Sequence, residues 1–287
     1  MSDSDTAARV GVDVGGTFTD VVAVRDGRVR VHKVASTPEA PERGVVDGLE
    51  AAAADEPLDA VGTLAHGTTV ATNAVLEREW ADTALLTTDG FRDVLEIGRQ
   101  DRPELYDLHA ATPDPVVPRD RRYGVAGRLD ERGAELEPLD TAAVRELAAD
   151  LDAESVAVAL LFAFEDDGHE RAVRDALREG GYEGSVSLSS DVLPEIREYE
   201  RTLATALNAA LRPVMAGYLG RLDDRVDRAG VRAPLRVMAS NGGLLDAERA
   251  REAPVRTLLS GPAAGVRGAA HVAARHGHDD ALTMDPS

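Results

Sequence analysis

The stretch that decides the fold is Val10-Gly11-Val12-Asp13-Val14-Gly15-Gly16-Thr17-Phe18-Thr19-Asp20-Val21-Val22. An apolar run ends in an aspartate, two glycines and two hydroxyl residues follow, and a second apolar run then opens with another aspartate. This pattern predicts two antiparallel strands joined by a tight turn. Paired glycines let the backbone approach an anion without Cβ atoms in the way, and they reach positive φ angles at little steric cost.

The residue types of this turn suit a bound phosphate group. The candidate ligand-binding residues are Gly15, Gly16, Thr17, Thr19 and Asp20. A carboxylate repels phosphate, so we expect Asp13 to hold a metal ion or its water molecules. The segment is not a Walker loop, because it has no Gly-Lys-Ser/Thr sequence and the only lysine of the chain, Lys33, lies outside it. An ordinary Gly-Gly hairpin is the alternative.

The composition narrows the possible functions. Of 287 residues, 43% are hydrophobic but only 3% aromatic, so the cores must consist mainly of Ala, Val and Leu. A net charge of −20 argues against a nucleic-acid partner held through phosphate contacts. Because the chain has no cysteine, disulfides, thiolate nucleophiles and cysteine metal sites are excluded.

The charged residues also predict adaptation to high salt. Asp and Glu total 52, and the basic residues are arginine with one exception. Strong screening makes the self-repulsion of such a surface tolerable. A GC-rich genome is the alternative, and it explains arginine over lysine but not the excess of acids.

No membrane or export signal is recognised in the sequence. We expect residues 1–8 to form a disordered tail, since they are small, polar and acidic and lack the features of a signal peptide. The best apolar run, 156–164, has the length of a strand and not of a membrane span. The sequence therefore predicts a cytoplasmic protein without a membrane partner.

Beyond the hairpin, strand-like and helix-like segments alternate, which is typical of α/β architecture. We expect strands at 29–34, 61–65, 83–88, 155–164, 185–189 and 235–239, and helices at 38–54, 70–79, 139–151, 168–179 and 198–228. The segment 258–262 is expected to lead into a last, alanine-rich helix that reaches about residue 275. Segment 98–122, rich in Asp, Pro and Arg, predicts an extended loop. The apolar face of the helix at 139–151 is expected to contain Leu139, Ala143, Leu147 and Leu151.

Two features of the long helix at 198–228 lead to specific expectations. Pro213 should kink it or split it in two, because proline removes a backbone donor and its ring clashes with the preceding turn. Acidic and basic residues alternate from Glu195 to Arg201, which predicts a solvated start of the helix.

A second candidate site is His66-Gly67-Thr68-Thr69, between an expected strand and an expected helix. Free N–H groups and the positive end of the helix dipole at such a junction suit an anion or a substrate carbonyl. We therefore take His66, Thr68 and Thr69 as candidate catalytic residues, with His66 as a proton carrier. The alternative is a helix capped by one of the two threonines, with the histidine as a bystander.

Two later segments contain glycine-rich turns. Asn241-Gly242-Gly243 could line a ligand, although a plain turn is the simpler interpretation. Ser260-Gly261-Pro262-Ala263-Ala264-Gly265 precedes a helix, so Ser260 and Gly261 could cradle phosphate or adenosine. A capped helix with close-packed small residues is the alternative. Ser260 is not expected to be a nucleophile, because its surroundings are not Gly-x-Ser-x-Gly.

Taken together, the chain strongly resembles the hydantoinase A/5-oxoprolinase family, which includes the acetone carboxylase β subunit. The motifs that carry the resemblance occur in family order: 10–24, His66 to Ala74, Leu193 to Thr202, Ser240 to Gly243 and Leu259 to Gly265. The resemblance implies an α/β fold of the actin-like, sugar-kinase-like (ribonuclease H-like) ATPase class, containing the first lobe and the beginning of the second. It assigns residues 9–190 to the N-terminal domain and 191–287 to the start of the hydantoinase A domain.

The resemblance also implies an activity. Family members use ATP and Mg²⁺ to open a cyclic amide such as hydantoin, N-methylhydantoin or 5-oxoproline by phosphorylating its carbonyl oxygen, usually with a hydantoinase B-type subunit. On this basis Asp13 would hold the magnesium of the nucleotide. The rivals are acetone-carboxylase-like activation of a ketone, another phosphoryl transfer such as that of a sugar or small-acid kinase, and a fragment without catalysis.

The end of the chain departs from the family pattern. Family members continue from the strand expected at 280–285 into a second Asp-x-Gly-Gly-Thr-Ser-Thr-Asp loop and several hundred further residues, whereas here Pro286 and Ser287 follow. We therefore expect a truncated or frameshifted gene product, or one piece of a split gene.

Overall fold

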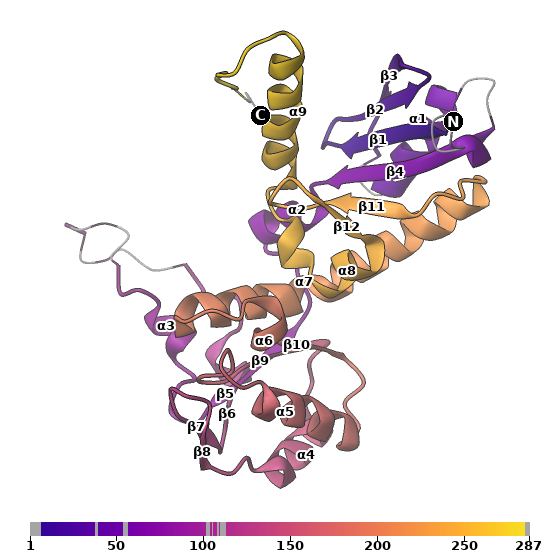
Figure 1. The fold of residues 1–287 in the computed structure, drawn as a ribbon. Helices are drawn as coiled ribbons and strands as arrows, with labels where there is room; N and C mark the ends of the chain where they lie inside the picture. The colour runs from indigo at the N-terminus through magenta and orange to yellow at the C-terminus, as the bar shows by residue number, and fades with distance from the viewer. Residues whose placement is uncertain are drawn as a thin grey trace. The chain divides into compact units, whose positions relative to one another are not determined.

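The computed structural model describes residues 7–37, 40–53, 57–101, 104, 106, 107, 109 and 113–284, and it divides the chain into two compact units (Figure 1). The first unit combines the chain up to Glu79 with the chain from Val214 onward, and the second is Trp80–Pro213. Helix α7 (Glu198–Arg228) contributes to both units, because the boundary falls inside it.

The first unit contains a six-stranded sheet with the order β12-β11-β4-β1-β2-β3. The predicted hairpin is confirmed: β1 (Ala8–Val14) pairs antiparallel with β2 (Phe18–Arg25), which pairs antiparallel with β3 (Arg28–Ala35). On its other side β1 pairs parallel with β4 (Val61–Thr68), and β4 pairs parallel with β11 (Leu235–Met238). The short edge strand β12 (Leu244–Asp246) pairs antiparallel with β11 and was not predicted.

Helix α1 (Pro41–Ala53) packs closely on strands β1 to β3. Glycines on the helix make this approach possible, because a Cβ atom at Gly48 would lie 2.5 Å from the Cγ2 atom of Val21. Val12 is paired with Val21 across the strands and is equally buried, so this face of the hairpin is the apolar one. The predicted helix therefore exists and begins at Pro41, while Pro38 lies outside the described residues.

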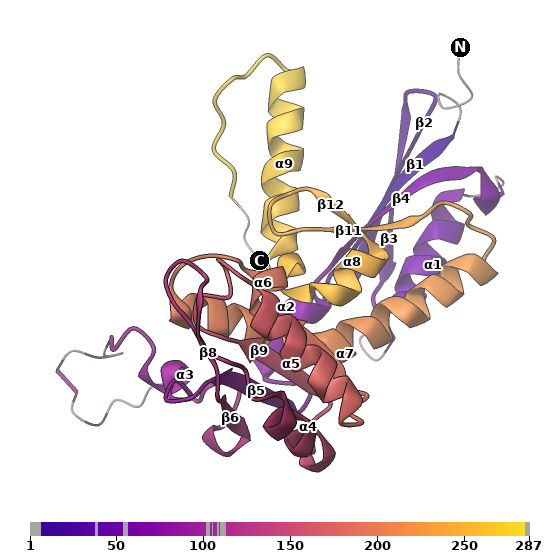
Figure 2. The ribbon, with the colours of Figure 1, turned by 60° about the horizontal axis from the view of Figure 1, so that its bottom comes forward.

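The other elements of the first unit are helices, most of which are labelled in Figure 2. They are η2 (Leu58–Ala60), α2 (Val70–Glu77), the second part of α7, α8 (Ala247–Glu252), η4 (Pro254–Thr257) and α9 (Ser260–Arg275). Three expectations need correction. Strand β4 continues through His66 to Thr68, since it is paired with β1 along its whole length. Of the two outcomes expected at Pro213, the split does not occur, because α7 is one helix from Glu198 to Arg228. Residues 280–284 form no strand.

The second unit is built on a parallel sheet with the order β10-β9-β5-β6. Its strands are β5 (Thr83–Thr88), β6 (Arg122–Val125), β9 (Ser155–Ala159) and β10 (Ser185–Leu188). Every residue of β5 and β9 is buried, as expected for central parallel strands that are covered on both faces. The remaining elements are α3 (Val94–Ile97), η3 (Arg119–Arg121), β7 (Arg128–Leu129), β8 (Glu135–Glu137), α4 (Thr141–Asp150), α5 (Gly168–Glu179) and α6 (Ser189–Val192).

Alternate residues of β5 and β9 point into two cores. Leu86 and Val158 pack with α4 and α5, whereas Leu85 and Ala157 pack with Ala206 of α7 and its neighbours. The strand expected at 155–164 ends at Ala159, so that expectation is wrong. The apolar face expected at 139–151 is confirmed for Leu139, Leu147 and Leu151, which pack against the core, but Ala143 is exposed and the fully buried residues of α4 are Val144 and Ala148. The segment 98–122 is largely irregular where it is described, apart from η3 and the first residue of β6.

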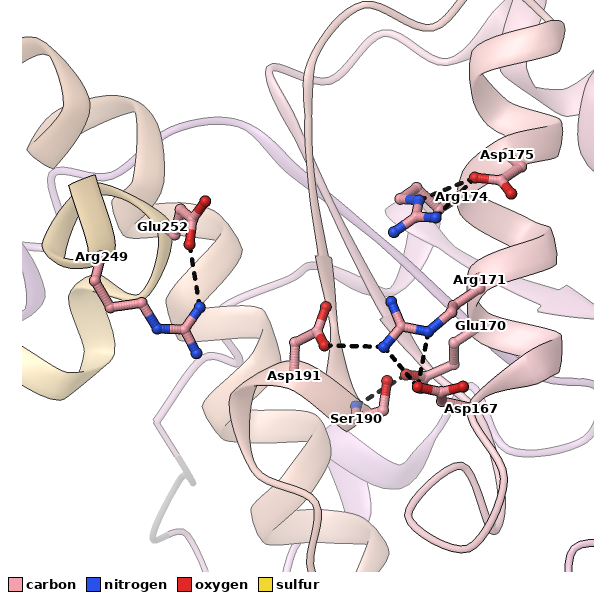
Figure 3. A network of polar contacts seen from close by, with 9 residues as sticks. All are labelled: Asp167, Glu170, Arg171, Arg174, Asp175, Ser190, Asp191, Arg249 and Glu252. Carbon is pink, nitrogen blue, oxygen red and sulfur yellow. Dashed lines mark hydrogen bonds and ion pairs between the residues drawn. The ribbon is translucent and has the colours of Figure 1, made fainter.

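Two buried charged side chains, Glu170 and Arg201, hold the loop that follows β9. Figure 3 draws Glu170 with one of its partners, Ser190. The Glu170 carboxylate accepts hydrogen bonds from the Leu160 N–H (3.0 Å), the Ser189 hydroxyl (2.6 Å) and the Ser190 N–H (2.9 Å). Arg201 donates to the Leu160 carbonyl oxygen at 3.0 Å. Both backbone groups of Leu160 are thus bound by buried side chains. Arg201 is only 1% exposed, so the expectation of a solvated helix start fails for this residue.

Replacing the buried carboxylate should destabilise the second unit. Glu170→Ala leaves two buried N–H groups and a hydroxyl without their acceptor, and we expect a loss of about 3 kcal/mol in the free energy of unfolding. Urea unfolding followed by circular dichroism measures this loss. The control is Glu183→Ala, at an exposed position of the same unit, which should change stability by less than about 0.5 kcal/mol. Equal stabilities of the two variants would contradict the assigned role.

Candidate functional site

Parallel pairing of β1 with β4 brings two of the predicted motifs together in the first unit. Asp13 lies opposite Gly67, and Val14 lies opposite Thr68, at the carboxyl ends of the two strands. The carboxyl ends of parallel strands are where α/β proteins commonly bind ligands. The candidate metal ligand of the first motif therefore lies beside the second motif.

The Asp13 carboxylate is seated over the backbone of Gly67. A Cβ atom at Gly67 would lie 2.6 Å from Asp13 Oδ1, which is shorter than any normal contact. Glycine is thus required at position 67 for a steric reason, because any side chain there would displace the Asp13 carboxylate.

A second carboxylate faces Asp13 across the hairpin. Asp20 is its partner in the β1–β2 register, and opposed residues lie on the same face of the sheet. Shielding by surrounding protein atoms, and then the charge of Asp20, raise the pKa of Asp13. Asp20 is itself paired with Lys33, whose Nζ lies 2.9 Å from Oδ1 and 3.0 Å from Oδ2. This arrangement favours a cation beside Asp13.

The turn between β1 and β2 differs from the expected conformation. Gly15 and Gly16 do not have positive φ angles, so conformational freedom is not what requires glycine here. Neighbouring protein atoms do not require glycine at 16 either, since a Cβ there would meet nothing within 4 Å, and a Cβ at Gly15 would meet only the Phe18 carbonyl oxygen at 3.2 Å. Thr17 is exposed. The turn therefore presents backbone and one hydroxyl residue to the surroundings.

Ser36 fixes this turn from the end of β3. Its hydroxyl donates to the Gly15 carbonyl oxygen (2.8 Å), and its N–H donates to the Thr17 carbonyl oxygen (3.0 Å). The Thr19 hydroxyl lies 3.0 Å from the Ser36 hydroxyl and is fully buried, so Thr19 supports the turn from behind. The sequence analysis missed Ser36, because no local pattern predicts a contact between residues that are 21 positions apart.

His66 is fully buried. Its Nε2 atom lies 2.7 Å from the hydroxyl of Tyr218 on α7, while Nδ1 has no hydrogen-bond partner among the described residues. Burial lowers the pKa of His66 to about 4, so the ring is neutral near pH 7. Burial likewise raises the pKa of Tyr218. The described surroundings suit a neutral ring that orders the end of β4.

The amino end of α9 meets the end of β4. The Ser260 hydroxyl donates to the Thr68 carbonyl oxygen (3.2 Å), and the Leu259 N–H donates to the Thr72 hydroxyl (3.2 Å). Leu259 has a left-handed φ of 55° directly before the helix. Ser260 is therefore buried as a structural contact, whereas a Cβ at Gly261 would meet nothing within 4 Å.

The threonines of the second motif have different surroundings. The Thr68 hydroxyl accepts a hydrogen bond from the Val70 N–H at 3.2 Å, and Thr68 is buried. Thr69 is the N-cap residue of α2 but makes no capping hydrogen bond with its side chain. It lies 3.5 Å from the amide of Asn73. Of the two hydroxyls, that of Thr69 is the more accessible.

The turn at 240–243 also contacts α9. Gly242 has a φ of 76°, and a Cβ there would lie 2.7 Å from the Arg267 side chain. The Asn241 side chain accepts the Gly243 N–H at 2.9 Å, and the Ser240 N–H donates to the Arg256 carbonyl oxygen at 2.8 Å. The plain-turn interpretation accounts for these contacts.

Comparison with known proteins identifies the family. Residues 9–181 match the hydantoinase/oxoprolinase N-terminal region, and residues 201–286 match the hydantoinase/oxoprolinase domain. The chain therefore belongs to the hydantoinase/oxoprolinase family.

Its relatives include enzymes of known name. The caprolactamase subunit alpha of Pseudomonas jessenii is 34% identical over 96% of this chain and 42% of its own length. The 5-oxoprolinase 1 of Arabidopsis thaliana is 32% identical over 90% of this chain and 23% of its own length. This chain thus spans less than half of either relative.

Solved structures agree on the fold. The ATP-dependent caprolactamase of Pseudomonas jessenii superposes with a TM-score of 0.84 at 33% identity, and nucleotide-free acetone carboxylase with a TM-score of 0.83 at 30% identity. Each match covers 94% of this chain and 41% of the other. The chain has the mixed α/β fold with parallel sheets of the actin-like ATPases, as predicted.

The buried histidine predicts a pH-dependent stability. His66 has a folded pKa of about 4 against 6.5 when exposed, so the unfolded chain takes up the proton first as the pH falls. Stability present above pH 6.5 should therefore decline by about 3 kcal/mol as the pH falls to 4. Urea unfolding across this range should show that His66→Gln lacks this decline, while the control His271→Gln, at an exposed position, retains it. Parallel curves for all three proteins would contradict the assignment.

Proposed function

We propose that this chain supplies the phosphate-binding loop and part of the substrate site of an enzyme that opens a cyclic amide at the expense of ATP. The observation that carries the proposal is the Asp13 carboxylate seated over Gly67, which joins the first two family motifs in one place. Hydantoin, N-methylhydantoin, 5-oxoproline and related lactams are the proposed substrates.

The residues present fit a magnesium ion bound with the nucleotide. Partial removal from water, and then the facing Asp20 carboxylate, raise the pKa of Asp13, so a cation beside it relieves repulsion. Among the residues that the structure describes, no group of three or more His, Cys, Asp or Glu side chains could hold a metal ion. Asp13 would therefore share the ion with phosphate and water oxygens, as is usual for Mg²⁺. When bound, the ion neutralises charge on the phosphates.

The turn provides donors for the phosphates. The Gly16 backbone and the Thr17 hydroxyl form its accessible surface, while the Gly15 N–H donates to the Phe18 carbonyl oxygen at 3.0 Å and closes the turn. Gly261 leaves room at the amino end of α9. The proposal gives Thr19 and Ser260 supporting roles, because their hydroxyls are buried against Ser36 and Thr68. Asp20 is held by Lys33 and contributes charge next to Asp13.

The second motif would face the reacting carbonyl. Thr69 offers its hydroxyl at the start of α2, and Thr68 orders the strand end through the Val70 N–H. His66 is buried against Tyr218, so we propose that it positions this strand end and carries a proton only if the site opens.

The proposed reaction activates an unreactive bond. Resonance keeps an amide carbonyl poorly electrophilic. The carbonyl oxygen attacks the γ-phosphorus of ATP, ADP leaves and the ring nitrogen loses its proton, which gives an imidate-like phosphate. Water adds to the carbon, the ring C–N bond breaks as the nitrogen takes a proton back, and an acyl phosphate remains. A second water then hydrolyses the acyl phosphate to a carboxylate and inorganic phosphate. The chain's residues align the groups and stabilise charge, which is the main contribution of proteins to phosphoryl transfer.

Two alternative functions can be distinguished from cyclic-amide opening by experiment. The likeness to acetone carboxylase favours activation of a ketone by the same loop. The chain spans about two fifths of the caprolactamase subunit alpha, and the second alternative is a chain that binds ligand without turnover. Because that relative is a subunit, we also propose a second subunit, of the hydantoinase B type, as partner. None of the described helices is long and apolar enough to cross a membrane.

ATP binding and turnover test the proposal directly. The purified chain is given MgATP at high salt with 5-oxoproline, hydantoin, caprolactam or acetone, and calorimetry and phosphate release are measured. We expect MgATP binding, and turnover stimulated by a cyclic amide should fall about a hundredfold in Asp13→Asn but not in the control Asp47→Asn, at an exposed position of α1. Binding without turnover would favour the incomplete site, and stimulation by acetone the ketone reaction. The absence of MgATP binding would refute the proposal.

The contact between Asp13 and Gly67 provides a sharper test. In Gly67→Ala the new Cβ displaces the carboxylate, and we expect MgATP affinity to fall about tenfold, which is about 1.4 kcal/mol. The matched control is Gly11→Ala, since a Cβ at Gly11 on the same strand as Asp13 meets nothing within 4 Å. Isothermal calorimetry measures both affinities. Equal affinities would show that the placement of Asp13 does not matter for the nucleotide.

A further inference from the structure

The single lysine of this chain lies beside the candidate phosphate loop. The sequence has 32 basic residues, of which 31 are arginine, and Lys33 is the exception. Its ammonium group bonds both oxygens of Asp20 and lies 5.0 Å from the centre of the Phe18 ring. Phe18 directly follows the turn, so this ammonium group is close to the place proposed for phosphate.

Three charged residues form a row across the sheet. Asp13 on β1 is opposite Asp20 on β2, which is opposite Lys33 on β3. Opposed residues share a face, so the two carboxylates compete for one cation from the protein. Lys33 neutralises Asp20 and leaves the row with one net negative charge.

We propose that Lys33 selects the ligand of this site: it favours a divalent cation that arrives with a polyphosphate over the divalent cation alone. The inference rests on the proposed function. Without the ammonium group, two facing carboxylates would attract a free divalent cation more strongly and repel the phosphates. With it, the site has one carboxylate for the metal and an ammonium group near the anion. Lys33 is therefore a specificity-determining residue.

The Lys33–Asp20 ion pair is exposed to solvent, so the ammonium group can exchange its carboxylate partner for a ligand. The Lys33 and Asp20 side chains are 55% and 44% exposed. An ion pair this accessible to water is weak, so exchange of Asp20 for a phosphate oxygen costs little. The cation–π contact with Phe18 keeps the ammonium group near the turn during that exchange.

Two binding measurements test the selection. Mn²⁺ is titrated alone by electron paramagnetic resonance, and the non-hydrolysable MgATP analogue AMP-PNP by calorimetry. We expect Lys33→Met to bind Mn²⁺ about tenfold more tightly and the nucleotide about tenfold more weakly. Lys33→Arg, which keeps the charge, and Arg28→Met, which removes a charge from the other end of β3, should stay within about twofold of the parent chain for both ligands. If Lys33→Met behaves as Arg28→Met does, the proposal is wrong.

The lone lysine also permits a chemical readout. An amine-reactive reagent can modify only Lys33 and the terminal α-amino group, and the latter is an internal reference for mass spectrometry. Saturating AMP-PNP with Mg²⁺ should slow modification of Lys33 and not of the terminus. A parent chain that binds the nucleotide with Lys33 unprotected would overturn this role and leave the proposed function standing. If the parent chain does not bind nucleotide, the proposed function fails, and an unchanged Mn²⁺ affinity of Lys33→Met would then overturn the charge argument as well.

Discussion

The candidate site depends on one steric constraint, the absence of a side chain at Gly67 beneath the Asp13 carboxylate. Parallel pairing of β1 and β4 places the two residues opposite each other, and any Cβ would lie 2.6 Å from an oxygen of the carboxylate. The direction of Asp13 is therefore set by a residue that lies 54 positions away in the sequence. Asp13 in turn faces Asp20, and Asp20 is paired with Lys33. The turn held by Ser36 follows Asp13 directly.

Helix α7 supports the site through the contact of its Tyr218 with His66. The helix is continuous although it contains Pro213, a residue that disfavours a helix interior. A proline in a helix interior costs about 3 kcal/mol, since one hydrogen bond is lost and the ring crowds the preceding turn. Burial on both sides of Pro213 offsets this cost: Ala210 and Leu211 before it and Tyr218 after it are almost fully buried. The continuous course of α7 brings Tyr218 to His66, and that buried pair orders the end of β4. Packing therefore decided the course of the helix, against its local preference.

Local patterns predicted the elements that such patterns specify. Helix α5 has the predicted bounds because an acidic residue and glycine start it and glycines follow it, and the hairpin at 8–25 was evident from its alternation and its turn. The misses have tertiary causes. Strand β4 extends through His66 to Thr68 because these residues pair with β1, and His66 also pairs with β11. Arg201 is buried because Leu160 and Glu195 offer it carbonyl oxygens. The role of Ser36 and the seat of Asp13 likewise depend on pairings that no short window of sequence contains.

The charge of the chain gives these local contacts their importance. At a net charge of −20 the protein repels a nucleotide at long range, so attraction has to come from donors within a few ångströms. The accessible turn and the lone ammonium group offer such donors, and a cation beside Asp13 would add a positive charge at the same range. Salt shortens the repulsion to a Debye length of about 3 Å at 1 M, while contacts at hydrogen-bond distance are screened much less. The high-salt setting expected from the acidic composition would thus weaken the repulsion more than the contacts, which makes an acidic surface compatible with the phosphate-binding role proposed for the turn.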